Sequence, residues 1–426
     1  MSRVVPWETF INKIRQYFST FVLIRGLLIS ALGSSFIYLA YWNLSFPFVN
    51  TLLALTALYL LLQEDRKIWF ISGAFIGLFW FWWIALSLEH YGMTWAVPIE
   101  LFIIMLSYGF LFWLIAYLAE KSPLGHTAIK ALGLLLLSYV HPFGFDWLKP
   151  ELMFVQSYLG IHKWQFFIIL ATMVLSIYKK QLLYLFFLIL AYQPTVHTQS
   201  KPLQDIVLIS TQTTVQEKWN KDLHKAQFEA VFSQIDKAIA EKKTLIVFPE
   251  SIFPIFLNRS QDNLKRLKAK AKNISIVIGG LYWDGKTPRN SSYIFTKGKV
   301  SIANKVLLVP FGESNPLPDF LSDWVNKVFY DGAIDYKAST DITDYYIDSV
   351  QYRNAICFEA TAEKLYEGNP ARIIVISNNG WFTPSTEPTL QKLLLVYYSK
   401  KYGTTIYHAV NMSASYIIQK GKVLNP

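Results

Sequence analysis

Three residues of different types can together perform acyl transfer through a thiol. Cys357 is the only cysteine of the 426-residue chain, and it follows an apolar run that is typical of a buried strand. Glu250 follows a second run of this kind, and Lys305 ends a third. A thiol with a pKa of about 8.5 is mostly protonated at neutral pH, so a nucleophilic cysteine needs a base or a cation beside it. We interpret Glu250 as the base and Lys305 as the cation.

Each residue has a defined chemical task in this interpretation. Glu250 can take the proton of Cys357 and later return it, or deprotonate an incoming amine. Lys305 can stabilise a tetrahedral oxyanion and keep Glu250 ionised. Glu313 follows a Pro-Phe-Gly turn and can orient Lys305 or the base. Taken singly, such residues are more often a surface carboxylate, a solvated lysine and a packed thiol. Their sequence contexts must therefore show whether they form an active site.

The first half of the chain is much more apolar than the second. Residues 1–200 contain 12 Lys and Arg and 8 Asp and Glu, against 28 and 21 in the remainder. An overall hydrophobic content of 53%, with 14 Trp and 31 Phe, is high for a soluble protein. We therefore predict a membrane domain over residues 1–195 and a catalytic domain over residues 200–426.

About seven membrane spans are expected, although three are shorter than the roughly 20 residues that a hydrocarbon core requires. They lie near residues 21–41, 47–62, 68–88, 96–119, 127–141, 164–178 and 181–193. With a cytoplasmic N-terminus, the inner segments carry ten Lys and Arg, beginning with Arg3, Lys13 and Arg15, and the outer loops carry two. The positive-inside rule then places everything after Tyr192 outside the cytoplasm. For a bacterium this is the inner membrane, with the catalytic domain on the periplasmic side.

Other classes of function have less support. A transporter usually places ionisable residues in mid-membrane, and Glu100 is the one plausible case, so the spans are interpreted as a scaffold. The net charge of +11 is explained either by attraction to anionic lipid headgroups or by lysines that are simply solvated at the surface. Nucleic acid is not an expected partner, because the catalytic domain is predicted to lie outside the cytoplasm. Seven scattered His and one Cys form no metal-ligand cluster, and no phosphate-binding glycine loop occurs, so no metal or cofactor is predicted.

The second half alternates between strand and helix patterns. Strands are expected near 205–210, 245–248, 274–278, 352–358 and 372–377, with hairpins at 290–295/300–305 and at 404–411/414–418, the latter closing around Gly421. Helices are expected over 222–242, 262–272 and 388–401. Such alternation predicts one layered α/β domain.

The contexts of the three residues resemble those of the nitrilase, or carbon–nitrogen hydrolase, superfamily. Residues 248–251 are similar to its glutamate motif, Lys305 with 308–313 to its lysine motif, and 356–359 to its nucleophile turn. Residues 376–382 resemble the strand and loop that follow. The resemblance covers about 205–422 and implies an αββα sandwich.

A multi-span bundle before such a domain resembles the apolipoprotein N-acyltransferase family. The resemblance implies that Cys357 takes an acyl chain from a phospholipid as a thioester and passes it to the amine of a diacylglyceryl-cysteine on a lipoprotein. It implies that Glu313 and Glu359 are supporting carboxylates. It also implies that Trp219, Trp381 and Phe358 contact substrate or form a lid. A monomer is expected.

The sequence departs from this pattern in several places. Phe358 stands where a tyrosine is common, residues 379–380 and 383 differ from the usual types, and the sequence ends at Pro426 without the final span of larger members. Two alternatives stay open: a membrane-tethered amidase of the same superfamily, and a receptor or transporter with a non-catalytic nitrilase-like domain.

Overall fold

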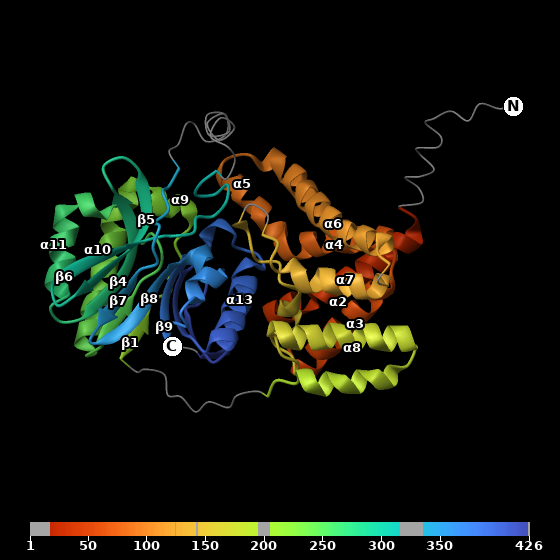
Figure 1. Ribbon diagram of the computed structural model, residues 1–426. Helices are drawn as coiled ribbons and strands as arrows, with labels where there is room; N and C mark the ends of the chain where they lie inside the picture. Colours follow the sequence, from red (N-terminus) through yellow and green to blue (C-terminus); the bar gives the residue numbers. More distant parts are fainter. Residues whose placement is uncertain (1–17, 124, 142–143, 195–204, 316–334, 425–426) are drawn as a thin grey trace. The chain divides into compact units, whose positions relative to one another are not determined.

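The computed structural model describes residues 18–123, 125–141, 144–194, 205–315 and 335–424. The chain forms two compact units (Figure 1). The first comprises Met1–Val140 and Leu148–Thr195, and the second comprises His141–Trp147 and Val196–Pro426. The predicted basic residues Arg3, Lys13 and Arg15 lie outside the described residues.

The regular elements of the first unit are helices in its described residues, apart from an isolated β-bridge between Leu159 and Tyr192. Its main helices are α2 (Thr20–Tyr41), α3 (Pro47–Gln63), α4 (Arg66–Phe81), α6 (Val97–Lys121), α7 (His126–Leu137) and α8 (Lys163–Lys179). Shorter pieces are η1 (Trp82–Leu86), α5 (Ser87–His90), η2 (Thr94–Ala96), η4 (Pro150–Phe154) and η5 (Leu182–Ala191).

Each predicted span coincides with helix, with differences in length and type. Among the described residues, three helical stretches are long and apolar enough to cross a membrane: Thr20–Tyr41, Arg66–His90 and Thr94–Lys121. The fifth predicted span ends early, at Leu137, and the seventh is a 3₁₀-helix. A 3₁₀-helix rises about 2.0 Å per residue, so its ten residues reach further than ten α-helical ones would.

Helices α4 and α6 pack closely because α4 presents glycines to its neighbour. A Cβ on Gly73 would lie 2.5 Å from Cβ of Phe112, and one on Gly77 would lie 2.6 Å from the ring of Tyr108. Small residues at such contacts let helices in a membrane approach closely. On the outer face of α6, Phe102 and Phe110 are 59% and 58% exposed, as expected of side chains that contact lipid.

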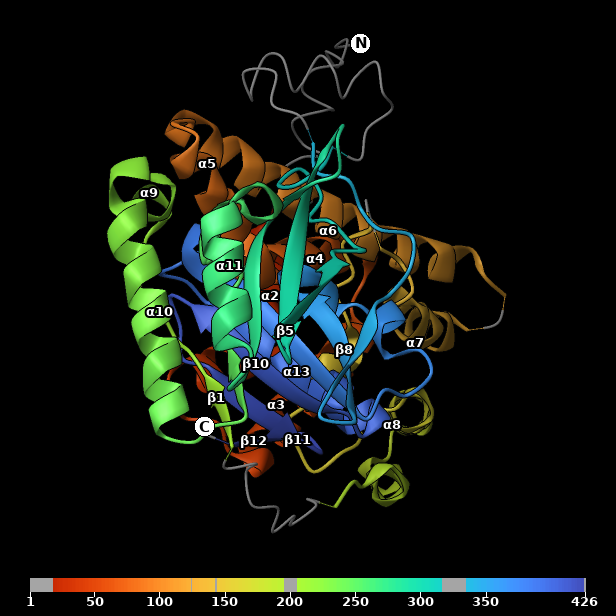
Figure 2. The same ribbon diagram turned by 90° about the vertical axis from the view of Figure 1, so that its left-hand side faces the viewer.

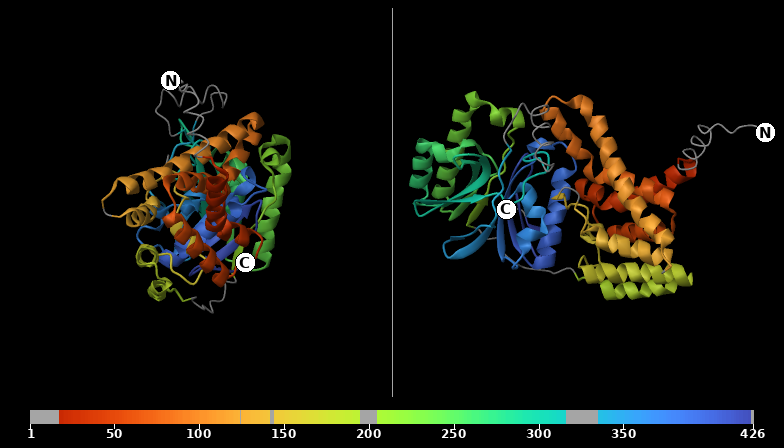
Figure 3. Two further views of the ribbon diagram at one scale, coloured as in Figure 1. Left: turned by 90° about the vertical axis from the view of Figure 1, so that its right-hand side faces the viewer. Right: turned by 45° about the horizontal axis from the view of Figure 1, so that its top comes forward.

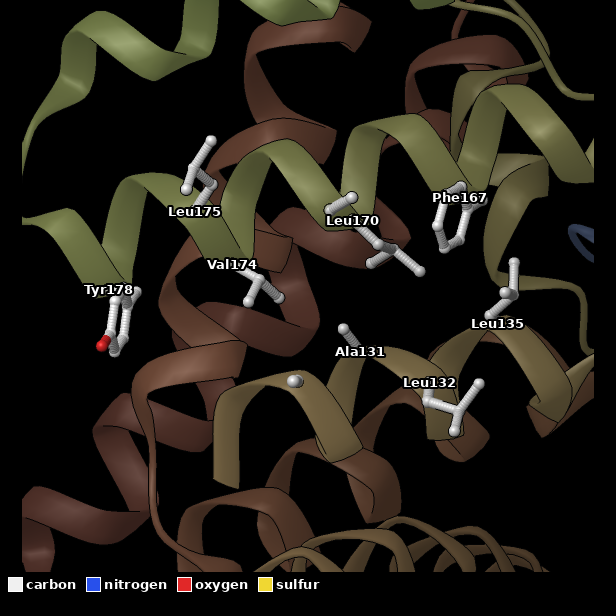
Figure 4. Close-up of a pocket in the computed structure, with 10 residues that line it drawn as sticks. Ala131, Leu132, Leu135, Phe167, Leu170, Val174, Leu175 and Tyr178 are labelled. Atoms are coloured by element: carbon white, nitrogen blue, oxygen red, sulfur yellow. The ribbon is translucent and has the colours of Figure 1, made fainter. Parts of the chain in front are cut away.

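Helices α7 and α8 enclose a cavity of about 380 Å³ (Figure 4). Leu132 and Leu135 of α7 face Phe167, Leu170 and Val174 of α8 across it. The lining is almost wholly apolar, so the space suits hydrocarbon.

The second unit contains two six-stranded sheets. The first sheet has the order β1 (Ile206–Leu208), β2 (Leu245–Val247), β4 (Ser275–Trp283), β5 (Pro288–Thr296) and β6 (Lys299–Asn304), with β3 (Phe253–Phe256) also paired to β4. The second has the order β12 (Lys422–Leu424), β11 (Tyr416–Gln419), β10 (Thr405–Asn411), β9 (Arg372–Asn378), β8 (Val350–Ile356) and β7 (Asp344–Ile347).

These sheets form the two middle layers of an αββα sandwich. Helices α10 (His224–Ala240) and α11 (Gln261–Lys270) cover the first sheet, and α13 (Glu387–Tyr402) covers the second (Figures 1, 2 and 3). Successive strand residues point to opposite faces, so β2 serves two cores. Ile246 packs in the core beneath α10 and α11, whereas Leu245 and Val247 pack between the sheets with Ile374 and Ile376 of β9.

The predicted strands and helices of this unit are confirmed, with modest shifts in their ends. Both predicted hairpins form, as β5–β6 and β10–β11. The turn at Gly421 instead joins β11 to β12, a pairing that was not predicted. Strands β3 and β7 were not predicted either; β3 is only four residues long and begins directly after the turn that carries Glu250.

Candidate active site

Glu250 lies in the turn that follows β2, with only 7% of its surface exposed. The turn is tight, because Ser251 has a φ of 49° and its backbone crowds β4. A Cβ on Gly279 would lie 2.4 Å from the nitrogen of Ser251 and 2.7 Å from Cα of Glu250. Glycine at this position of β4 therefore allows the turn to seat Glu250 against the sheet.

Lys305 follows β6 and is buried between two carboxylates. Its Nζ lies 2.7 Å from Oε2 of Glu313 and 3.9 Å from Oε1 of Glu250. Burial alone would lower the pKa of Lys305, but the charges of Glu313 and Glu250 reverse the effect and raise that pKa. The lysine is therefore a permanent cation at the centre of this cluster.

The two carboxylates are also joined by a neutral side chain. Nδ2 of Asn290, on β5, donates to Oε1 of Glu250 at 2.6 Å and to Oε1 of Glu313 at 2.8 Å. The backbone carbonyl of Asn290 accepts from the amide of Lys305 at 2.9 Å. Asn290 thus fixes the spacing of all three charged groups, yet its position inside a regular strand gave no sequence signal of this task.

Burial raises the pKa of Glu250, and Glu313 adds to the rise while Lys305 opposes it. A carboxylate is a better proton acceptor when its pKa is raised toward the working pH. The environment thus makes Glu250 more basic than an ordinary glutamate.

Cys357 is the first residue after β8, at the start of the 3₁₀ turn η8 (Cys357–Thr361). Its φ of 53° is unusual for a residue with a side chain, and such backbone strain is often found at functional sites. Burial raises the pKa of Cys357, Glu250 raises it further, and Lys305 opposes the rise. The sulfur therefore interacts electrostatically with both other members of the predicted trio, and it rests as a thiol that needs a base.

Glu359 connects the turn of the cysteine to the segment after the lysine. Its Oε1 accepts from the amide of Ile356 at 2.7 Å, and its Oε2 accepts from the amides of Val306 at 2.7 Å and Leu307 at 3.2 Å. The side chain is 1% exposed, and burial raises its pKa to about 7, against three backbone hydrogen bonds and Lys305. Geometrically, Glu359 supports the relative placement of Cys357 and Lys305.

The predicted substrate-contacting aromatics lie in different surroundings. Phe358 is buried and stacks on Phe145 and Trp147, with ring centroids 5.8 Å and 6.3 Å away. Trp219 ends the short helix α9 (Val215–Trp219) and is 40% exposed. Trp381 ends the 3₁₀ turn η10 (Asn379–Trp381) and is partly buried. Their contact with substrate stays a prediction.

Two ionisable residues near the trio were not singled out from the sequence. Lys218 of α9 is 2% exposed, and its Nζ donates to the backbone carbonyl of Glu250 at 3.2 Å. Glu387, the first residue of α13, is also 2% exposed and contributes to the electrostatic environment of Cys357. Both lie just outside the helices predicted from the sequence, which begin at residues 222 and 388, so nothing in the sequence pattern placed them at the site.

Two further polar residues, both on β10, make hydrogen bonds that connect parts of the fold. His408 is fully buried, and its Nε2 lies 2.7 Å from Oγ of Ser377. Asn411 accepts from Oγ1 of Thr211 at 2.7 Å and donates to the carbonyl of Thr213 at 2.8 Å. It thereby connects the second sheet to the segment after β1.

Comparison with known proteins covers both units. Residues 20–195 match the family described as the apolipoprotein N-acyltransferase integral membrane domain. The chain is 42% identical over 394 residues to apolipoprotein N-acyltransferase of Wolinella succinogenes, covering 91% of this chain and 93% of that protein. It is 36% identical over 378 residues to the protein of the same name from Helicobacter pylori, covering 87% of each.

Solved structures of the nitrilase superfamily resemble about half of the chain. An amidase from Nesterenkonia aligns with a TM-score of 0.40 and 12% identity, over 52% of this chain and 84% of that one. A carbon–nitrogen hydrolase superfamily protein from Xanthomonas campestris aligns with a TM-score of 0.38 and 14% identity, over 51% of this chain and 83% of that one. Identity of 42% across nearly the full length of a relative, together with the matching membrane domain, shows that this chain belongs to the apolipoprotein N-acyltransferase family.

Proposed function

We propose that this protein acylates the N-terminal amine of a diacylglyceryl-cysteine on bacterial lipoproteins, with a membrane phospholipid as donor and a thioester on Cys357 as intermediate. The observation that carries the proposal is the buried cluster in which Lys305 lies 2.7 Å from Glu313 and 3.9 Å from Glu250, while all three interact with the thiol. Membership of the family supports the reaction class.

In the first half-reaction, Glu250 takes the proton of Cys357 as sulfur attacks the ester carbonyl. The raised pKa of Cys357 makes this base necessary, since little thiolate forms spontaneously. The fixed positive charge of Lys305 stabilises the oxyanion of the tetrahedral intermediate, and Glu313 holds the lysine in place. Collapse forms the thioester and breaks the ester bond, and Glu250 gives its proton to the departing alcohol oxygen of the lysophospholipid.

In the second half-reaction, the lipoprotein amine attacks the thioester. Glu250 takes a proton from the attacking nitrogen, the carbon–sulfur bond breaks, and the proton returns to sulfur. A thioester is more reactive than the amide that replaces it, so this step runs downhill. The buried surroundings of Glu250 and Lys305 disfavour water, which supports aminolysis over hydrolysis.

The membrane unit supports the choice of substrates. Both carry acyl chains that reside in the bilayer, and the unit has three helical stretches long and apolar enough to cross one. We propose residues 1–195 as the membrane domain of a monomer in the bacterial inner membrane and residues 200–426 as its periplasmic catalytic domain. The charge distribution of the sequence supports this orientation.

The test follows a labelled acyl chain from phospholipid through purified full-length protein in mixed micelles. Without acceptor, we expect label on the protein that hydroxylamine removes, and none on Cys357→Ala. With a diacylglyceryl-cysteine peptide, the label should move to the peptide as a hydroxylamine-resistant amide. Lys221→Met, which changes an exposed lysine of the same unit, serves as the matched control. Release of free fatty acid alone, with no peptide product, would favour the amidase alternative.

A further inference from the structure

Lys218 is a second buried ammonium beside the proposed catalytic groups. It belongs to α9, whose start is fixed by reciprocal hydrogen bonds between Thr214 and Glu217. Its side chain passes under the turn of Glu250, where Nζ donates to the backbone carbonyl of that residue at 3.2 Å. Only 2% of Lys218 is exposed.

The ionisable groups that face this ammonium are Glu250 and Cys357, and both favour its charged form. On the other side, Nε2 of His224, the first residue of α10, lies 3.2 Å from the backbone carbonyl of Lys218. A buried ammonium is costly unless negative charge compensates it. Burial accordingly lowers the pKa of Lys218 to about 8, despite the opposing effects of Glu250 and Cys357.

Electrostatic interaction is mutual, so Lys218 must in turn favour the ionised forms of its neighbours. Around the thiol, negative charge comes from Glu250, Glu313 and Glu387, and Lys305 opposes it. Lys218 adds positive charge on the α9 side. Unlike Lys305, which pairs directly with Glu313, Lys218 bonds to the main chain of the residue that serves as base.

We propose that Lys218 is a positioning residue of the acylation step, which holds the turn of Glu250 in place and lowers the cost of ionising Cys357. This inference rests on the proposed function in one respect, namely that thioester formation is the step that Lys218 assists. At neutral pH, below its pKa of about 8, Lys218 stays protonated, and the transferred proton passes from the sulfur of Cys357 to the carboxylate of Glu250.

The first test measures thiol ionisation with no lipid substrate. Full-length protein in detergent is alkylated with iodoacetamide across a pH series, and Cys357 is the only thiol that can react. For Lys218→Met, which keeps chain length and loses the charge, we expect alkylation at pH 7 to be about tenfold slower, equivalent to about one pKa unit. Because the pKa of Lys218 is about 8, the difference between the variant and the unmodified protein should disappear as the pH rises above 8. Lys221→Met should follow the unmodified protein.

Two further variants separate charge from folding and from hydrogen bonding. Lys218→Arg should restore the alkylation rate at pH 7, since the side chain of residue 218 lines a cavity of about 200 Å³ in which the larger guanidinium has room. Lys218→Gln keeps a donor for the carbonyl of Glu250 without the charge, and its alkylation at pH 7 should slow as that of Lys218→Met does. If the methionine variant fails to fold, the glutamine variant carries the test.

An unchanged alkylation rate at pH 7 in a folded neutral variant would overturn the inference. The acyl-transfer assay is run in parallel, where we expect slower thioester formation for Lys218→Met and recovery for Lys218→Arg. If the unmodified protein formed no thioester while the alkylation shift persisted, the proposed function would fail and the electrostatic task of Lys218 would stand.

Discussion

Two ion pairs at helix ends of the membrane unit contrast with the buried cluster of the α/β unit, although the membrane unit also buries Glu151, which pairs with Lys163 at 2.6 Å. In the membrane unit, Arg25 pairs with Glu64 at 2.5 Å and Arg66 with Glu120 at 3.3 Å, near the ends of α2, α3, α4 and α6. In the α/β unit, Lys305 is 1% exposed and lies between carboxylates in the interior. Charge at helix ends costs little, because it can reach the interface. Charge in the interior is expensive, and in the α/β unit the cluster of Lys305 with two carboxylates marks the candidate site.

The largest expected effect comes from removing the base at the centre of the buried cluster. Glu250→Gln keeps an oxygen that can accept from Asn290, so the fold should survive, but the side chain can no longer take a proton. We expect thioester formation from phospholipid to slow by about 10²- to 10⁴-fold. Quantitative mass spectrometry of the acyl-enzyme checks this. Near-normal acylation by a folded variant would remove Glu250 from the role of base.

Removing the buried cation should damage stability as well as chemistry. In Lys305→Met, Glu250 and Glu313 face each other without the ammonium that separates them. Breaking a buried ion pair from one side typically costs about 3 to 5 kcal/mol. Thermal unfolding in detergent and acyl-enzyme formation should both decline. Loss of acylation with unchanged stability would show that Lys305 serves the reaction but not the fold.

Glu387 offers a way to tune the buried cluster through pH. Burial raises its pKa from 4.5 to about 8, so the folded state favours the neutral acid. The neutral side chain therefore contributes fully to the stability of the folded state below pH 4.5, the pKa in the unfolded chain. This contribution is lost as the pH rises through the folded-state pKa of about 8. Glu387→Gln stays neutral, so its melting temperature, measured by thermal unfolding in detergent, should fall less between pH 4.5 and pH 8 than that of the unmodified protein.

The same substitution has an expected effect on the thiol. Above pH 8 an ionised Glu387 raises the pKa of Cys357, so Glu387→Gln should speed alkylation of Cys357 in that range. This is the opposite of the effect expected for Lys218→Met. Slower alkylation of Glu387→Gln at alkaline pH would contradict the charge assignments around the thiol.

The order of strands and helices in the α/β unit was predictable, because apolar runs and turn residues punctuate this part of the sequence. The approach of Glu250 to Lys305 was also anticipated, because their complementary chemistry and their sequence contexts indicated one cluster, and the structure places both after strands of the same sheet. Asn290 and Lys218 were not foreseen as parts of the site. A strand asparagine and a lysine of a short helix have ordinary local patterns, and only tertiary packing shows that they contact the turn of Glu250.

The membrane unit was less predictable in its details. Apolar composition located the helices at all seven predicted positions, three of which are long and apolar enough to cross a membrane, but a uniformly apolar segment carries no period that separates α-helix from 3₁₀-helix, as in Leu182–Ala191. The close packing of Gly73 and Gly77 on α6 was equally hidden, because glycine is common in membrane helices for more than one reason.

The smallest effect is expected for the partly exposed ion pair between Arg66 and Glu120 of the membrane unit. Arg66 and Glu120 have side chains 37% and 30% exposed, so solvent screens their attraction. An exposed pair of this kind contributes about 0 to 1 kcal/mol, and Arg66→Gln should change the melting temperature little and leave thioester formation intact. A loss of stability as large as that of Lys305→Met would mean that helix-end charges hold the membrane unit together. The contrast between the two units would then lie in chemistry alone, since both would depend on charge for their folding.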